Sequence, residues 1–567
     1  MQTSEMTRSS IPAPSSLTSR SSNYANQYDR ERAALLARRE ADWRNGPIVY
    51  QVIVDRFAPP DDLDAKRHLY APPRRLRRWD EKPQPGTYLD DVNVWSHELD
   101  FWGGDLVSLR GHLDYLDQLG VDVLYLNPIQ RAFTNHKYDA QDYFEVSPEY
   151  GTRADVRALA ADLHARGMRL VLDGVFNHMG RSSPWFADAL RDPASPWREW
   201  FFFGPQYRFG YRAWANVENL PELNLENPRV RERLWGDADS AVRGYLRDGV
   251  DGWRLDVAFD IGFSYLAELS AAAHREKPGS LVIGEVWNYP EQWSPALDAT
   301  INFHTRQILF HLVRGEVSGA HAGRMIARQI EDAGLEPILK SWIVLDNHDT
   351  ERLRHLFPSG ADRRFLQALQ FTLPGSPMIY YGTELGMSGA QDPTNRAPMD
   401  WTLVNDENRE LAWTRRLVAL RREARALRVG DFRLLDSERL LAFQRWTDRA
   451  AETVVVLANA ESEPVTEVLA VRDSKLMNWT VLRDVLDASE FAVEGEPSPH
   501  SDEGEQPGRT IRPVSREDVP STSGGHKPVE GQVMSGTIRL TVPPRTVLVL
   551  RPVIETTQEY SAYKRVQ

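Results

Sequence analysis

The chain has 567 residues and a mass of 64.7 kDa, which is too long for one small domain and favours a large core with one or two appended modules. Hydrophobic residues make up 41% and charged residues 26%, and no apolar run approaches the roughly 18 residues of a membrane span, so we expect a water-soluble protein with no membrane partner. The formal net charge of −13 argues against nucleic acid and favours a neutral ligand, and the absence of cysteine excludes disulfides, thiolate catalysis and cysteine-held zinc.

The first 26 residues are rich in Ser, Thr and Pro and lack the apolar segment of a secretory signal. We interpret them as a disordered tail of a cytoplasmic protein, with an organelle transit peptide as the alternative. Residues 1–44 are predicted to be this tail and its lead-in.

From about Pro47 the sequence alternates between short apolar strands and amphipathic helices, such as one whose apolar face holds Leu106, Leu109, Leu113 and Leu116. The predicted strands are Ile48–Val54, Val121–Leu126, Arg169–His178, Gly252–Ala258, Leu281–Trp287, Ala299–Phe303, Trp342–Asp346 and Pro377–Tyr381. Near-continuous apolar strands separated by helices indicate a parallel sheet buried on both faces. Eight such strands predict an α/β fold, a closed (β/α)8 TIM barrel, over residues 45–430.

Two regions interrupt or follow this alternation. Residues 179–226 are dense in aromatic rings and are predicted to form a small inserted subdomain after the third strand. Residues 431–555 carry short alternating strands, which predict a C-terminal antiparallel β-sandwich. Within it, residues 494–531 are rich in Pro, Gly, Ser and Glu and are predicted to be a disordered insertion, and residues 556–567 a tail.

Polar side chains gather where the barrel strands end, which is where such barrels carry their catalytic groups. They are Asp173, Asn177 and His178 on the third strand, Arg254 and Asp256 on the fourth, Glu285 on the fifth, and His348 and Asp349 after the seventh. Two facing carboxylates with a third nearby and two histidines suit glycosidic cleavage. A divalent metal held by the same acids and histidines is the alternative, and the Arg254–Asp256 pair alone also fits a structural salt bridge.

Seven ordered blocks of sequence resemble the α-amylase family, glycoside hydrolase family 13. Four are DGVFNH from Asp173, GWRLD from Gly252, GEVW from Gly284 and LDNHD from Leu345. The others are NHKYD from Asn135, LPELN from Leu220 and GSPMIYYGTE from Gly375. Asn127–Ile129 together with NHKYD looks most like the neopullulanase, cyclomaltodextrinase and maltodextrin glucosidase branch.

The resemblance implies a role for each site residue. Asp256 would be the nucleophile, Glu285 the general acid and then base, and Asp349 would stabilise the transition state. Arg254 would keep Asp256 ionised and aimed. The remaining substrate-binding positions would be Tyr138, Asp139, His178, His348, Asp392 and Arg396.

The resemblance implies no required cofactor, although calcium is possible near Asp55, Asp61 and Asp105, where a solvated acidic loop is the alternative. Phe259–Asp260 replaces the Lys-His pair that many amylases have after the nucleophile, so contacts to the leaving group are open. The partner would be an α-glucan oligosaccharide, and the leading hypothesis is a retaining α-glucan hydrolase. The alternatives are an α-glucan transglycosylase with the same triad and a catalytically silent sugar-binding protein.

Overall fold

The computed structural model describes residues 27–473, 476–487 and 528–553. Eight parallel strands close into a barrel in the order β1-β14-β13-β12-β11-β10-β9-β6. Their bounds are β1 Val49–Val52, β6 Val123–Leu126, β9 Arg169–Gly174, β10 Gly252–Leu255, β11 Leu281–Val286, β12 Ala299–Asn302, β13 Trp342–Val344 and β14 Ser376–Tyr380. The predicted (β/α)8 barrel is therefore confirmed, with every predicted strand present and most of them shorter by one to four residues.

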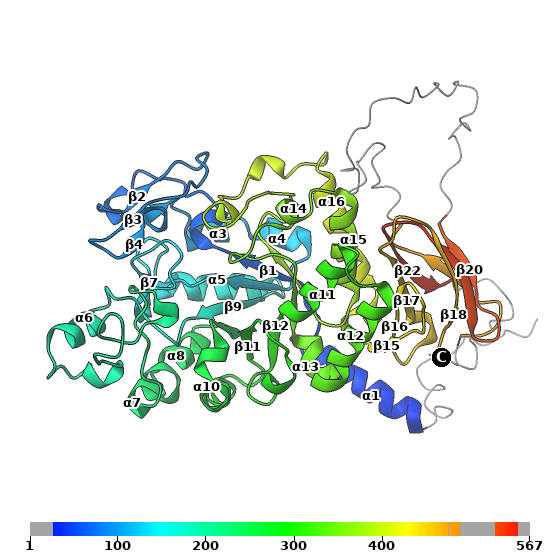
Figure 1. Cartoon of the computed structure of the whole chain (residues 1–567), viewed down its shortest axis with the longest axis horizontal. Coiled ribbons are helices and arrows are strands. Elements are labelled where there is room, and N and C mark those ends of the chain that lie inside the picture. The colour runs from blue at the N-terminus through cyan, green and yellow to red at the C-terminus, as the bar shows by residue number, and fades with distance from the viewer. Residues whose placement is uncertain (1–26, 474–475, 488–527, 554–567) are drawn as a thin grey trace, which may run out of the picture.

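Helices surround this barrel and contact the outer faces of its strands (Figure 1). The longer helices that follow strands are α4 Leu113–Leu119, α5 Arg153–Ala165, α8 Ala241–Arg247, α10 Phe263–Glu276, α11 Phe303–Val313, α12 Gly319–Ala333, α15 Gly360–Thr372 and α16 Arg409–Glu423. Strand residues that alternate with the helix-facing ones form a separate apolar cluster inside the barrel, including Tyr125, Ile283 and Trp342. Arg254 points inward like Gly252 two residues before it, so its positive charge needs acidic partners inside the barrel.

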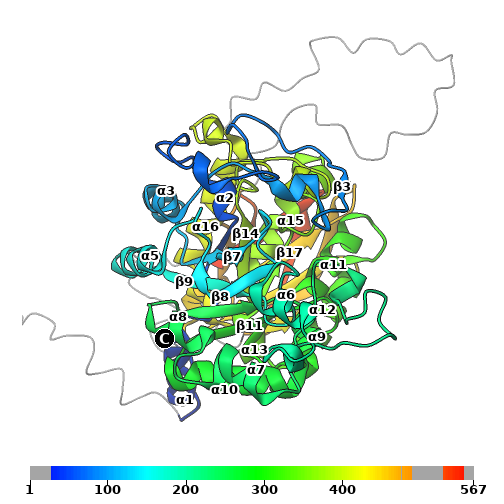
Figure 2. The same cartoon turned by 90° about the vertical axis from the view of Figure 1, so that its left-hand side faces the viewer.

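Shorter helices and strands lie in the connections between these longer elements. The helices are α2 Val54–Phe57, α3 Leu106–Arg110, α6 Pro184–Arg191, α7 Pro228–Arg231, α9 Ala258–Ile261, α13 Leu335–Lys340, α14 Leu353–Leu356 and α17 Arg425–Val429. The strands are β2 Arg75–Leu76 with β5 Asp100–Phe101, β3 Tyr88–Leu89 with β4 Val94–Trp95, and β7 Gln130–Ala132 with β8 Ala140–Val146. Figure 2 views the molecule from the end that carries β3 and α6.

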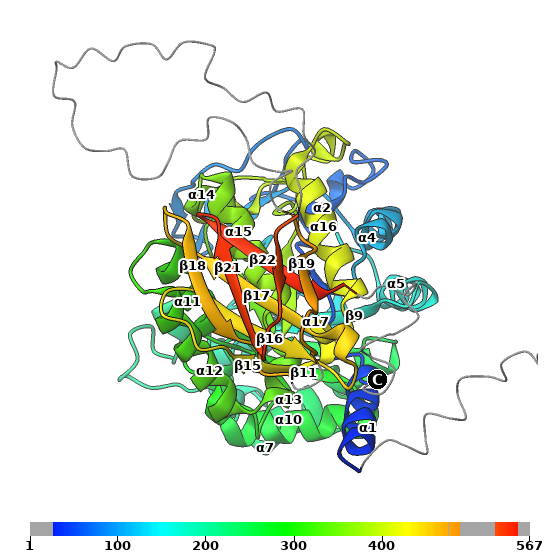
Figure 3. The same cartoon turned by 90° about the vertical axis from the view of Figure 1, so that its right-hand side faces the viewer.

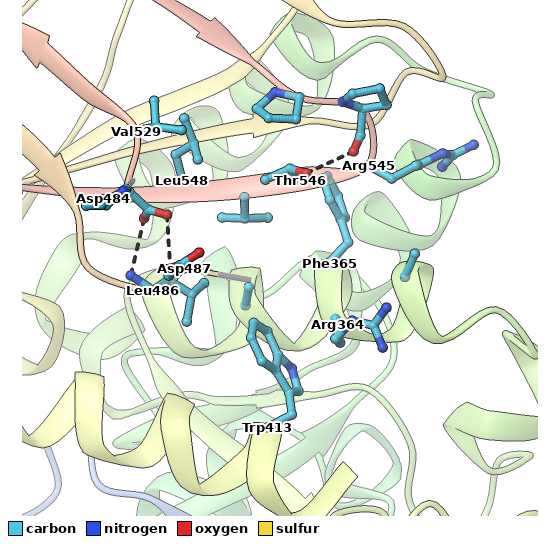
Figure 4. Close-up of a pocket in the computed structure, with 16 residues that line it drawn as sticks. Arg364, Phe365, Trp413, Asp484, Leu486, Asp487, Val529, Arg545, Thr546 and Leu548 are labelled. Atoms are coloured by element: carbon cyan, nitrogen blue, oxygen red, sulfur yellow. Dashed lines mark hydrogen bonds between the residues drawn. The ribbon is translucent and has the colours of Figure 1, made fainter. Parts of the chain in front are cut away.

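The C-terminal part is built from antiparallel strands, as predicted. One sheet has the order β15-β16-β17-β22-β19-β20 and the other pairs β18 with β21 (Figure 3). The bounds are β15 Asp431–Leu434, β16 Leu441–Trp446, β17 Val454–Asn459, β18 Val465–Ala470, β19 Val481–Asp484, β20 Glu530–Gln532, β21 Thr537–Val542 and β22 Thr546–Pro552. A cavity of about 370 Å³ lies where this part meets α15 and α16, lined by Phe365, Trp413 and Leu548 (Figure 4).

Three local predictions differ from the structure. The lead-in contains a helix, α1 Gln27–Ala41, which is held in place because Arg39 donates 2.9 Å to Glu336 and 2.8 Å to Asp431. The predicted insertion 494–531 loses its last two residues to β20, while its residues 494–527, like the predicted tails before residue 27 and over residues 556–567, lie outside the described residues. The helix expected through Leu106–Leu116 is two helices, α3 and α4.

Within the described residues, no helix has the length and apolar content that crossing a membrane would need.

Candidate active site

Arg254 is the centre of the site because three carboxylates converge on its guanidinium. The side chain is buried at the end of β10, and Asp173 on β9 is its neighbour in register. Its Nη1 lies 2.8 Å from Oδ1 of Asp173 and 3.0 Å from Oδ1 of Asp256, and its Nη2 lies 2.9 Å from Oε2 of Glu285. One buried cation therefore serves three acids, so the cluster is rich in negative charge.

That surplus changes the titration of Asp256. Burial is the largest cause and raises its pKa well above the ordinary value of 3.8, and the charges of Glu285, Asp173 and Asp349 raise it further. Arg254 acts in the opposite direction and favours the ionised form. Asp256 is only 7% exposed, so little water reaches its carboxylate.

A strained turn sets Glu285 against Asp256. Val257, directly after Asp256, has φ 39°, in the left-handed region that β-branched residues rarely adopt at a cost of about 1–3 kcal/mol. In this conformation the Val257 N–H donates 3.1 Å to Oε2 of Glu285. The Nε1 of Trp287 donates 3.0 Å to the other oxygen, Oε1. Both oxygens of Glu285 thus have donors, and the indole of Trp287, which is 47% exposed, borders the acid.

Tyr138 and His348 form a stacked pair on the Asp173 side of Arg254. Their ring centroids are 5.3 Å apart at an interplanar angle of 4°. Oη of Tyr138 donates 2.9 Å to Asp173, and Nε2 of His348 lies 2.6 Å from the same Oη. Gln51 donates to Nδ1 of His348, so the imidazole proton is on Nε2, and burial lowers the pKa of His348 well below 6.5. His348 is therefore a neutral donor.

Asp349 lies at the mouth of the site, where its side chain is 34% exposed. Nε2 of His348 is 3.1 Å from its Oδ2, and the guanidinium of Arg396 is 3.4 Å from its Oδ1. Arg396 also lies 3.2 Å from Asp392. Burial alone would raise the pKa of Asp392, but the charge of Arg396 and the hydrogen bond and charge of His97 lower it by more. The pKa of Asp392 is therefore below its ordinary value of 3.8. Both acids thus have Arg396 as a shared partner.

His178 is buried with both ring nitrogens free of hydrogen-bond partners among the residues that the structure describes. Its Nε2 lies 3.9 Å from Oδ2 of Asp256, too far for a direct bond. Trp214 from the inserted segment stacks on the imidazole at 5.3 Å. Burial lowers the pKa of His178 to about 3, so the ring is neutral. A buried polar ring without a partner next to a carboxylate is suited to a ligand hydroxyl.

Asp139 does not take the position that the resemblance implied. The residue is fully buried, and its carboxylate accepts 2.5 Å from Oγ1 of Thr134 and 3.4 Å from the amide of Asn219. These bonds tie the loop before β8 to the inserted segment, so its side chain is not presented to a sugar. This corrects the expectation for Asp139.

The three acids expected near calcium do not share a site, because each has different surroundings. Asp55 is fully buried and accepts from Arg56 and from the N–H groups of Trp102 and Gly103. Asp105 caps α3 and pairs with Lys66 at 2.8 Å, while Asp61 is exposed. The described part of the chain contains no group of three or more His, Asp or Glu side chains arranged for a metal ion. The calcium expectation therefore has no ligand group there.

Sequence reasoning placed Asp173 among the polar residues at the strand ends without giving it a role, and it did not single out Gln51 or Asn127 as site residues. Asp173 is the second partner of Arg254, and Asn127 donates 2.9 Å to Tyr138. Gln51 ends the inward face of β1 and connects Asn127 to His348. The available signal was their position: each is a polar residue at the carboxyl end of an otherwise apolar strand.

The chain is similar to known carbohydrate-active enzymes along most of its length. The family model described as alpha amylase, catalytic domain, matches residues 51–419. A cyclomaltodextrinase of Geobacillus thermopakistaniensis (strain MAS1) is 33% identical over 80% of this chain and 75% of its own. An intracellular maltogenic amylase of Bacillus subtilis (strain 168) is 33% identical over 72% of this chain and 67% of its own.

A solved structure agrees with these relatives. The cyclic α-maltosyl-(1→6)-maltose hydrolase of Arthrobacter globiformis, in its ligand-free form, superposes with a TM-score of 0.67 at 29% identity, covering 76% of this chain and 94% of its own. The cyclomaltodextrinase name is that of the branch that the sequence blocks indicated. The chain belongs to the α-amylase family of glycoside hydrolases.

Proposed function

We propose that this enzyme hydrolyses α-glucosidic bonds of maltooligosaccharides, cyclodextrins or related short α-glucans, with retention of anomeric configuration and in the cytoplasm. The observation that carries the proposal is that Asp256 and Glu285 bind neighbouring nitrogens of one guanidinium. Carboxylates held this close fit the separation of about 5–5.5 Å found in retaining glycosidases better than the 6.5–9.5 Å of inverting ones. The names of the relatives support the substrate class, and the word intracellular in one of them supports the compartment.

The proposed reaction has two steps, with Asp256 as the nucleophile and Glu285 as the acid and then the base. Asp256 attacks the anomeric carbon while Glu285 gives its proton to the leaving oxygen, which forms a covalent β-glycosyl ester on Asp256. Glu285 then takes a proton from water, and the oxygen of that water displaces the ester to give an α-product. Asp349, His178 and His348 bind hydroxyls of the reacting sugar, and the hydrogen bond that Asp349 accepts strengthens because the hydroxyl becomes more acidic as positive charge develops on the ring. Tyr138 lies under that sugar.

We expect the first product from maltotriose to be the α-anomer. Two displacements at one carbon restore its configuration, whereas one displacement would give the β-anomer. Proton NMR of the anomeric signals, recorded within minutes of mixing and before mutarotation, measures this. A β-anomer as first product would rule out a covalent ester on Asp256.

A second candidate function is glycosyl transfer to a sugar. Trp287, which donates to Glu285, and Phe259 on α9, a helix that contacts the strand of Glu285, are 47% and 41% exposed, and a departing or an incoming sugar must lie near Glu285. An acceptor sugar stacked on such rings would compete with water for the same ester. Counting reducing ends against glucose units released from maltotriose separates the two reactions, because transfer produces no new reducing end.

The raised pKa of Asp256 predicts the acid side of the pH profile. The nucleophile must be ionised, so activity is lost as the pH falls through the pKa of Asp256. Because burial and neighbouring acids raise that pKa, the acid limb of kcat/KM should lie above pH 3.8. Circular dichroism at each pH separates this titration from unfolding. A profile that stays flat below pH 3.8 in folded enzyme would contradict the expectation.

A further inference from the structure

Two large exposed rings lie beside the proposed active site and have no role in the reaction described above. Tyr88 on β3 and Trp95 on β4 are 42% and 47% exposed. They are direct partners across this short antiparallel pair, so both rings leave the same face of the hairpin. Their centroids are 5.6 Å apart at 75°. The hairpin lies at the same end of the molecule as α6, away from the C-terminal sheets (Figure 1).

One line of contacts connects the rings to the catalytic centre through charged groups. From Asp349 the contacts pass to Arg396 at 3.4 Å, and from Arg396 to Asp392 at 3.2 Å. The Nε2 of His97 is 3.8 Å from Asp392, and the ring of His97 stacks on Trp95 at 6.1 Å. Charged and polar side chains therefore lie next to one another from Asp349 at the mouth of the site to His97, which stacks on Trp95.

A second line of contacts reaches the same hairpin through rings. His136 stacks on Tyr138 at 5.8 Å and 25°. Its Nε2 lies 3.8 Å from Oε1 of Glu98, whose Oε2 accepts 2.9 Å from the N–H of Trp95. Trp95 is thus the point at which both lines meet, although it lies more than 40 residues before Tyr138 in the sequence.

The two lines lead away from the leaving group. Glu285 must face the departing oxygen, and it binds Nη2 of Arg254. Asp173 lies on Nη1 of the same guanidinium, and Tyr138, where the ring line starts, donates to Asp173. The hairpin therefore extends the side of the site that holds the glycosyl group kept by Asp256, not the side from which the leaving sugar departs.

The hairpin is held in one conformation before any ligand arrives. Ser96 N–H donates 2.8 Å to the carbonyl of Thr87, and Gly86 N–H donates 3.1 Å to Nδ1 of His97. Rings fixed in this way lose little freedom when a ligand stacks on them. The acids Asp392 and Glu98 beside them disfavour an anionic ligand, whereas sugars offer neutral hydroxyls and apolar ring faces.

We infer that Tyr88 and Trp95 form a binding subsite for the glucose units of the substrate that are farthest from the cleaved bond on the glycosyl side. This inference rests on the proposed α-glucan hydrolysis. The subsite would make the enzyme favour longer chains over maltotriose, because only longer chains reach the hairpin.

The test compares kcat/KM on maltohexaose with kcat/KM on maltotriose. We expect Trp95→Ala to lower this ratio about tenfold, and Tyr88→Ala about threefold or more, as stacking on one aromatic ring is worth about that factor. Trp95→Phe keeps a ring and should retain most of the ratio. Trp479→Ala removes another exposed Trp, 66% exposed in the C-terminal part, and should leave the ratio as in the parent enzyme.

Calorimetry in the Asp256→Asn background removes turnover from the test. There Trp95→Ala should weaken maltohexaose binding about tenfold more than maltotriose binding. An unchanged ratio in both assays for Trp95→Ala and Tyr88→Ala would overturn the subsite. So would dissociation of a dimer by Trp95→Ala with the ratio unchanged, since the rings would then be a protein contact. A parent enzyme that cleaves no α-glucan would instead overturn the proposed function, while the calorimetry still decides the subsite.

Discussion

Asp256→Asn is expected to lower kcat on maltotriose by about 10⁴-fold or more, because an amide cannot form the glycosyl ester and no neighbouring group can replace it. The fold should persist. Asn keeps an oxygen for Nη1 of Arg254, now 3.0 Å from Asp256, and the change removes one of three negative charges around a single buried cation. We therefore expect Tm to hold or rise, as is common where a strained active site is relaxed.

Asp406→Asn is the matched control for this variant. The side chain of Asp406 is fully exposed, and its ion pair with Arg415 is long at 3.8 Å and therefore weak. The same chemical change should leave kcat and Tm as they are. Mass spectrometry of the Asp256→Asn protein excludes deamidation back to Asp. Turnover within tenfold of the parent enzyme in a verified sample would remove Asp256 as the nucleophile.

The barrel could be predicted because its information is local. Strands buried on both faces need continuous apolar residues, and segments such as Leu281–Val286 show this directly in the sequence. The catalytic rim followed from the same reading, because Arg254 and Glu285 stand at strand ends whose positions the pattern fixes.

The remaining parts of the site depend on contacts between segments that no local pattern contains. Asp173 meets Arg254 through the register of β9 with β10, and Asp139 is withdrawn from the site by Thr134 and Asn219. Helix α1 has a charged sequence with little apolar periodicity, and it is fixed by the distant partners of Arg39. Trp95 lies in a polar loop without any period, so its neighbours could not be predicted.

Glu285→Gln is expected to lower kcat on maltotriose about 10³-fold, since a poor alkoxide leaving group needs the proton that Glu285 supplies. An aryl maltoside with a strongly acidic phenol needs no such proton, so formation of the glycosyl ester should be almost as fast as in the parent enzyme. The ester should then accumulate as a burst of phenol, because Gln cannot deprotonate water for the second step.

The geometry around Glu285 allows this substitution to be read cleanly. Its Oε1 accepts from Trp287, and its Oε2 accepts from Val257 and Arg254, so a glutamine can keep its one oxygen on Val257 and Arg254 and loses only the acceptor for Trp287 together with the acid. Glu438→Gln, at an exposed position in the C-terminal part, is the matched control. Azide, a nucleophile that needs no base, should restore turnover of the aryl maltoside by releasing a glycosyl azide from Asp256. An equal loss on both substrates, without a burst and without an azide effect, would mean that Glu285 positions the substrate and that another group supplies the proton.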